Sequence, residues 1–130
     1  MLTCGIWATD RGLLARCVAS DGRAHPPVTL GDSIEQRTQF VERLDDLYSP
    51  DWELVLPARL TKSDPLMRIA QRHHVPVWVV PAFLVNAVRT LSQGPQFSMA
   101  ELLARMPRCP FLRRTLRRIS PVDSGQLDLL

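Results

Sequence analysis

The chain has 130 residues, of which 45% are hydrophobic and 22% are charged, and its formal net charge is +3. These values exclude a chain that is disordered throughout and favour one domain with a hydrophobic core. No run of about 18 apolar residues occurs, and residues 1–8 lack the basic start and long apolar stretch of a signal peptide. We therefore expect a cytoplasmic protein that makes no contact with a membrane.

The positive charge is concentrated near the C-terminal end. Residues 1–92 carry ten basic and ten acidic side chains, whereas residues 93–120 carry six arginines and one glutamate, a net charge of +5. The last ten residues contribute −2 through Asp123 and Asp128. An anionic partner would therefore bind near residues 93–120, through an attraction that salt weakens.

The three cysteines, Cys4, Cys17 and Cys109, are odd in number and none belongs to a CxxC pair. This pattern argues against a disulfide framework or a zinc site. Buried free thiols are the expectation.

The first predicted elements are three short strands. Residues 3–8 and 12–19 form two apolar runs around the turn Asp10-Arg11-Gly12, which indicates a β-hairpin. A third strand is expected at residues 27–31. It should lie at an edge of the sheet, because prolines at its entrance have no N–H for a central ladder.

Helices and strands then alternate. Asp32 or Ser33 can cap a helix that runs to about Tyr48, with Gln36 completing a capping box. The pattern next predicts a strand at 52–57, a helix capped by Ser63, a strand at 76–80 that is buried on both faces, and a helix over 83–91, closed by a turn at 92–95.

The expected fold is α/β, with a mixed five-stranded sheet in the order β-β-β-α-β-α-β-α and extra C-terminal helices. Short turns make the first three strands antiparallel, and helical crossovers make the last two parallel to the first. We divide the chain into a core at 1–95, amphipathic and basic helices packed on it at 96–120, and a tail at 121–130.

This element order is that of the ribonuclease-H-like fold, and the segments Gly5-Ile6-Trp7, 54–58 and 79–85 resemble the N-terminal domain of DEDD-type transposases. These enzymes of bacterial insertion sequences are relatives of the Holliday-junction resolvases. The resemblance covers residues 3 to about 105 and rests on pattern and spacing. It implies two divalent metal ions held between carboxylates.

The carboxylates that the resemblance requires are missing. Trp7 and Pro57 stand where it places the first Asp and the Glu, and the later acidic pair falls near Gln96 and Met99. Such side chains cannot supply the oxygen ligands that Mg²⁺ prefers, so we expect a pseudoenzyme with no metal, no cofactor and no catalytic residues.

Other acidic residues and a histidine pair have ordinary explanations. The nearby acids are Asp10, Asp51, Glu53 and Glu101. Asp10 suits a turn, and a glutamate on a strand or helix face is usually solvated, although retained metal binding by these acids stays open. His73 and His74 are expected at a helix C-terminus rather than at a metal, because adjacent residues on a helix point apart.

The C-terminal segment carries the positive functional signal. Residues 97–106 can form an amphipathic helix capped by Ser98, with Glu101 at its third position. If the following residues are helical, Leu112, Leu116 and Ile119 make one apolar stripe. The neighbouring surface then carries a basic patch that can contact phosphates, formed by Arg113, Arg114, Arg117 and Arg118.

Two functions of different class stay open. One is a non-catalytic ribonuclease-H-like module, left from a mobile element, that binds DNA or RNA without sequence preference through these four arginines. The other is a protein-interaction or homodimerisation module, in which the apolar stripe and the tail with Leu127, Leu129 and Leu130 pack on a partner.

Overall fold

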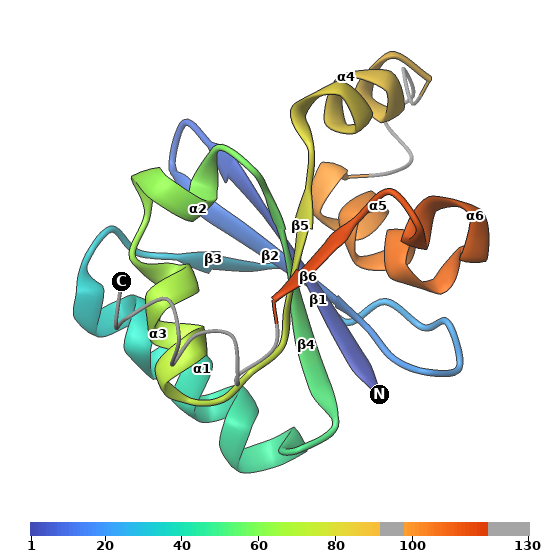
Figure 1. Ribbon diagram of the computed structural model, residues 1–130. Helices are drawn as coiled ribbons and strands as arrows, with labels where there is room; N and C mark the ends of the chain where they lie inside the picture. The colour runs from blue at the N-terminus through green and yellow to red at the C-terminus, as the bar shows by residue number, and fades with distance from the viewer. Residues whose placement is uncertain (92–97, 120–130) are drawn as a thin grey trace.

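The computed structural model describes residues 1–91 and 98–119, which form one sheet with helices on both faces (Figure 1). The strands are β1 (Leu2–Thr9), β2 (Gly12–Val18), β3 (Val28–Leu30), β4 (Trp52–Pro57), β5 (Val77–Val80) and β6 (Arg117–Ile119). The helices are α1 (Ile34–Tyr48), α2 (Leu60–Ser63), α3 (Leu66–Arg72), α4 (Ala82–Leu91), α5 (Met99–Arg105), the 3₁₀ turn η1 (Met106–Arg108) and α6 (Pro110–Arg113). The predicted turn at 92–95, Gln96 and the tail at 121–130 lie outside the described residues.

The sheet has the strand order β3-β2-β1-β4-β5-β6. Strands β1, β2 and β3 pair antiparallel, whereas β4 and β5 continue parallel to β1. The prediction of an α/β chain with a mixed sheet is confirmed, as are the five predicted strands and the edge position of β3.

The number of strands was predicted wrongly, because β6 adds a sixth. It pairs antiparallel with β5, through Val77↔Ile119, Trp78↔Arg118 and Val79↔Arg117. Residues 110–119 are therefore a short helix, a turn and an edge strand rather than one basic helix. Without β6, strand β5 would present unpaired backbone N–H and C=O groups, which a short extended segment satisfies.

Each face of the sheet has its own apolar core. Cys4, Ile6 and Leu54 point to the face covered by α1 and α3. Val55, Trp78 and Val80 point to the other face, where they pack with side chains of α4 and α5. Alternate residues of β4 and β5 enter opposite cores, so both strands are covered on both faces, as their apolar runs predicted.

Helix α5 lies unusually close to β1. A Cβ atom added to Gly5 would be 2.0 Å from the carbonyl oxygen of Ala100 and 2.7 Å from the nitrogen of Ala104. Glycine in the strand and alanine on the helix allow the two backbones to approach. The predicted cap of this helix is confirmed, since Ser98 Oγ accepts from the Glu101 N–H at 3.2 Å.

The caps of α1 and α3 differ in how well they were predicted. Ser33 and Gln36 form the expected capping box at α1, with Ser33 Oγ accepting from the Gln36 N–H at 3.1 Å. At α3 the prediction of Ser63 was wrong. Ser63 ends α2. The carboxylate of Asp64 instead accepts from the Leu66 N–H at 2.9 Å, because Asp64 lies one residue closer than Ser63 to the first turn of α3.

None of the helices within residues 1–91 and 98–119 is long and apolar enough to cross a membrane.

Candidate nucleic-acid interface

The four arginines of the basic patch lie on α6, the following turn and β6. All four are exposed. Within the described ranges, no carboxylate forms an ion pair with Arg113, Arg114, Arg117 or Arg118. Their positive charges are therefore not neutralised by neighbouring side chains of residues 1–91 and 98–119.

Trp78 brings two of these arginines together. The guanidinium carbon of Arg113 lies 5.2 Å from the centre of the Trp78 ring, and that of Arg118 lies 5.5 Å from it. Both distances are within the range of cation–π attraction. Arg118 is also the direct cross-strand partner of Trp78, so the two side chains share one face of the sheet.

Arg117 points to the other face, because successive residues of a strand alternate. Its cross-strand partner Val79 packs against the core beneath α1 and α3. The single patch expected from a helix is thus divided by the sheet. Arg113 and Arg118 meet at Trp78, whereas Arg117 belongs to the opposite side of the edge strand.

The predicted apolar stripe is used inside the chain. Leu116 and Ile119 are buried and Leu112 is half-buried. Leu112 and Leu116 pack in the core with Trp78, whereas Ile119 enters the core beneath α1 and α3. The stripe was predicted wrongly, because its residues belong to a helix, a turn and a strand.

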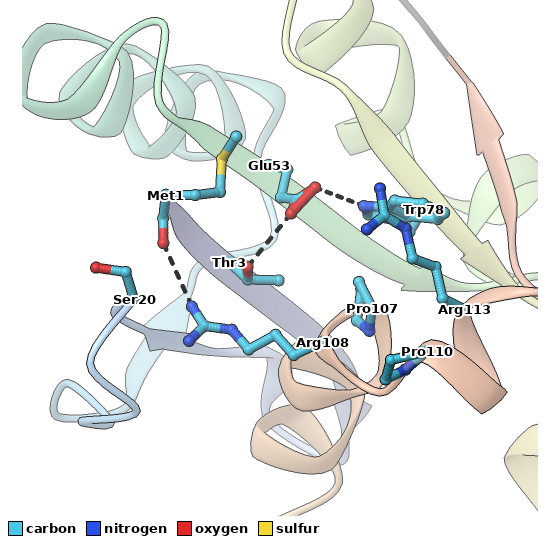
Figure 2. A pocket seen from close by; sticks show the side chains of 9 residues that line it. All are labelled: Met1, Thr3, Ser20, Glu53, Trp78, Pro107, Arg108, Pro110 and Arg113. Atoms are coloured by element: carbon cyan, nitrogen blue, oxygen red, sulfur yellow. Dashed lines mark hydrogen bonds between the residues drawn. The ribbon is translucent and has the colours of Figure 1, made fainter.

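A cavity of about 420 Å³ lies beside Arg113 and Trp78 (Figure 2). Arg113 and Trp78 line one side, and Arg108 lines another. Glu53 lies at its inner wall, where its carboxylate accepts from Trp78 Nε1 at 2.5 Å and from the Thr3 hydroxyl at 3.4 Å. This pocket combines a buried acceptor, Glu53, with the exposed side chain of Arg113.

Glu53 and Glu101 are not the solvated side chains that we expected. Glu53 is 8% exposed and Glu101 is 9% exposed. Glu101 lies 3.7 Å from Arg16 and 3.7 Å from Arg105, so its charge is compensated by two guanidinium groups. A buried carboxylate requires such partners. The sequence signal for a buried carboxylate was the position of Glu53 within the apolar run of β4.

Several other arginines are committed to internal contacts. Arg108 donates to the carbonyl oxygens of Val18 at 2.6 Å and of Met1 at 3.3 Å, and also to that of Ala19. It therefore joins η1 to the adjacent ends of β1 and β2.

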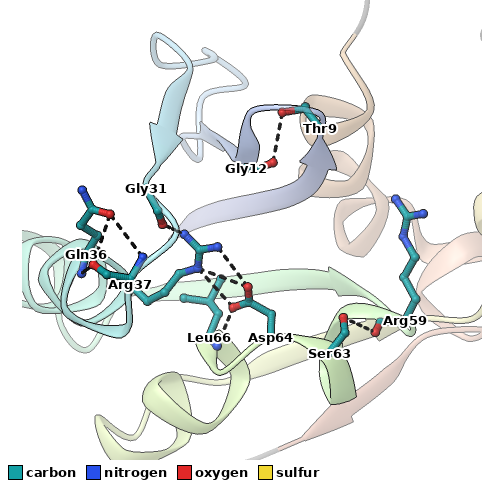
Figure 3. A network of polar contacts seen from close by, with 10 residues as sticks. Thr9, Gly12, Gly31, Gln36, Arg37, Arg59, Ser63, Asp64 and Leu66 are labelled. Atoms are coloured by element: carbon teal, nitrogen blue, oxygen red, sulfur yellow. Dashed lines mark hydrogen bonds and ion pairs between the residues drawn. The ribbon is translucent and has the colours of Figure 1, made fainter.

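Arg37 is held in the same way on the opposite face of the sheet (Figure 3). Its guanidinium donates to the Asp64 carboxylate at 3.1–3.3 Å, and also to the Gly31 carbonyl oxygen. The pair is nearly buried, with side chains 5% and 13% exposed. Arg37 therefore connects α1 to the start of α3 and is not available to a ligand.

The positions that the resemblance assigns to catalysis come together at the other end of the sheet. Trp7 and Pro57, near the carboxyl ends of β1 and β4, line a cavity of about 90 Å³. Arg59 lies over the Trp7 ring, 4.6 Å from its centre. Met99 opens α5 and is half-buried. Apart from the amide of Asn86, the lining residues that the structure describes are apolar or cationic, and none of them is a carboxylate.

No set of three or more His, Cys, Asp or Glu side chains within the described ranges could hold a metal ion. Asp10 is exposed in the hairpin turn and Asp51 is exposed before β4, so these acids stay apart. His73 and His74 follow α3, as predicted.

No protein-family model matches this sequence, and a comparison with curated proteins finds no relative.

Proposed function

We propose that this protein is a non-catalytic, ribonuclease-H-like module that binds nucleic acid through Arg113, Arg114, Arg117 and Arg118. The observation that carries the proposal is four exposed guanidinium groups within six residues, without a carboxylate partner among the described residues. Each is permanently charged and can bind a phosphate through two parallel hydrogen bonds.

The contacts at Trp78 support this proposal. A flexible arginine loses side-chain entropy when it binds, at a cost of about 0.5–1.5 kcal/mol for a rotamer-rich side chain. Arg113 and Arg118 already lie against one indole ring, which reduces that cost. Both residues remain exposed, so an incoming phosphate can reach both.

Phe111 gives the proposed site a preference for single strands. Its side chain is 81% exposed and lies on α6, in the same short helix as Arg113. Arg114 follows Phe111 by three residues, so the two side chains lie on the same side of the helix. Together they offer a base a stacking surface and a phosphate a counter-charge. Duplex bases are already stacked, so this contact is available only to unpaired ones. The base edges are not read, and sequence preference should be weak.

The non-catalytic part of the proposal rests on Trp7 and Pro57. An indole and a proline ring, with the Arg59 cation above the indole, cannot replace the carboxylates of a two-metal site. We expect no cleavage of DNA or RNA with Mg²⁺ or Mn²⁺. Cleavage that Asp10→Asn or Glu53→Gln abolishes would contradict this expectation, because displaced acids would then form the site.

Anisotropy of fluorescein-labelled oligonucleotides of about 20 residues, titrated over a range of salt, tests the binding. Replacing all four patch arginines with glutamine should lower the salt slope by up to about 0.7 per lost contact on single strands. The control removes the same charge from exposed arginines elsewhere, namely Arg11, Arg43, Arg68 and Arg72. Unchanged affinity and slope in the patch variant would show that the patch is not the binding surface.

Phe111→Ala tests the single-strand preference separately. It should weaken single-strand binding by about 1–3 kcal/mol and leave the salt slope unchanged, because no charge is lost. Phe83→Ala is the matched control, since that ring is 67% exposed but lies on α4. Equal affinity of the wild type for single strands and duplex would contradict the preference without contradicting phosphate binding.

The interaction-module alternative remains an outcome of the same measurements. Its apolar stripe packs in this chain's own cores, and its tail lies outside the described residues. If the wild type binds no oligonucleotide at low salt but self-associates in light scattering, this alternative replaces the proposal.

A further inference from the structure

Two of the free thiols face each other across the first hairpin. Cys4 of β1 and Cys17 of β2 are direct cross-strand partners, and both side chains enter the core beneath α1 and α3. Neither is in a disulfide. Because they are directly opposite each other, the two side chains are neighbours on one face of the hairpin.

The hairpin register determines the geometry of this pair. The two-residue turn makes Thr9 and Gly12 the closing, hydrogen-bonded pair, and alternation from there makes Cys4 and Cys17 a non-hydrogen-bonded pair. The carbonyl oxygen of Cys17 accepts from the His25 N–H at 2.8 Å, on the side away from β1, as this assignment requires. Such pairs have Cα atoms about 4.5 Å apart, inside the range of about 4.4–6.8 Å that a disulfide spans.

The two thiols differ in how they can be reached. Cys4 is fully buried, whereas Cys17 lines a cavity of about 280 Å³ between β2, β3 and α1. His25, Phe40 and Arg43 also line this cavity. A small reagent that enters here meets the sulfur of Cys17 first, and Cys4 lies directly behind it.

We propose that Cys4 and Cys17 are an oxidation site at which a hydroperoxide closes a cross-strand disulfide. Cys17 attacks the terminal peroxide oxygen as the thiolate and the O–O bond breaks. The departing oxygen takes up the proton that Cys17 lost, so the products are a Cys17 sulfenic acid and water or an alcohol. The Cys4 sulfur then attacks the Cys17 sulfur, the S–O bond breaks, and the leaving hydroxide takes the Cys4 proton and departs as water. Two thiols lose two electrons in total, and the peroxide gains them.

Burial raises the pKa of the Cys4 thiol, and the neighbouring Cys17 thiol acts in the same direction. Cys4 therefore remains protonated until the second step. This order of reaction agrees with the cavity, because a reagent that enters it reaches Cys17 first.

The test treats the reduced full-length protein with hydrogen peroxide, denatures it and alkylates the remaining thiols. We expect alkylatable thiols to fall from three to one, and a cross-link between the tryptic peptides of residues 1–11 and 17–23. Sulfoxide at Met1, which is 51% exposed, shows that the dose was sufficient. Three alkylatable thiols at that dose, or cross-links through Cys109, would overturn the proposal.

Two variants test which cysteine reacts with the peroxide and which one then closes the disulfide. In Cys4→Ala, Cys17 should be trapped by dimedone as the sulfenic acid, because its resolving thiol is missing. In Cys109→Ala, the thiols should fall from two to none, since Cys109 takes no part. Dimedone on Cys4 of the Cys17→Ala variant at an equal rate would contradict the order of attack. Peptide mapping of the wild type still decides the proposal if a core variant fails to fold.

Discussion

The close approach of α5 to β1 predicts that Gly5→Ala is strongly destabilising. The added Cβ would lie 2.0 Å from the Ala100 oxygen, although side-chain Cβ atoms essentially never come within 3.0 Å of another heavy atom. The helix must therefore retreat by about 1 Å, because both nearby atoms belong to its backbone and cannot rotate away. Overpacking of this kind costs about 1–3 kcal/mol. We expect the upper end of that range.

Urea unfolding followed by tryptophan fluorescence measures the effect. With an m-value of about 2 kcal/mol/M, a loss of about 3 kcal/mol lowers the unfolding midpoint by about 1.5 M. Gly31→Ala is the control, because its Cβ would meet the flexible side-chain end of Gln36 at 1.8 Å. That side chain can swing away, at the cost of part of a capping box, about 1 kcal/mol. If Gly5→Ala shifts the midpoint no more than Gly31→Ala, the described packing of α5 on β1 is wrong.

Three further predictions concern buried polar groups. Asp64→Ala leaves the guanidinium of Arg37 nearly buried without its carboxylate, and should cost about 3–5 kcal/mol in urea unfolding. Trp78→Phe removes the indole donor to Glu53, and should cost about 1.5–3 kcal/mol by the same assay. Burial raises the pKa of Cys4, so the unfolded chain ionises first as the pH rises. The free energy of unfolding of the reduced protein should therefore fall above about pH 9, by up to about 1.4 kcal/mol per pH unit, and Cys4→Ala should remove this slope.

The strands of the core were predictable because local signals agree with tertiary packing there. The turn at Asp10-Arg11-Gly12, the prolines before β3 and the apolar run of β5 each specify one arrangement. Ser33 and Gln36 likewise determine the start of α1 through contacts three residues apart. These features depend on neighbours in the sequence.

The segment after Cys109 was mispredicted because its outcome depends on a distant strand. The spacing of Leu112, Leu116 and Ile119 fits one face of a helix, and arginine is a good helix former. The open edge of β5 nevertheless takes residues 117–119 as a strand, since its backbone groups need partners. Glu53 was missed for the same reason, because its donors Thr3 and Trp78 are 50 and 25 residues away.

The position of β6 at the edge of the sheet gives Arg117 and Arg118 a second physical role. An edge strand exposes unpaired backbone groups, and charged side chains on it oppose pairing with another chain. The arginines of α6 and the turn, Arg113 and Arg114, do not have this role, because they lie outside the ladder. Two double variants, one at Arg113 and Arg114 and the other at Arg117 and Arg118, therefore separate the functions of the patch. Loss of oligonucleotide affinity without self-association identifies phosphate contacts at Arg113 and Arg114, whereas self-association after changes at Arg117 and Arg118 identifies protection of the edge.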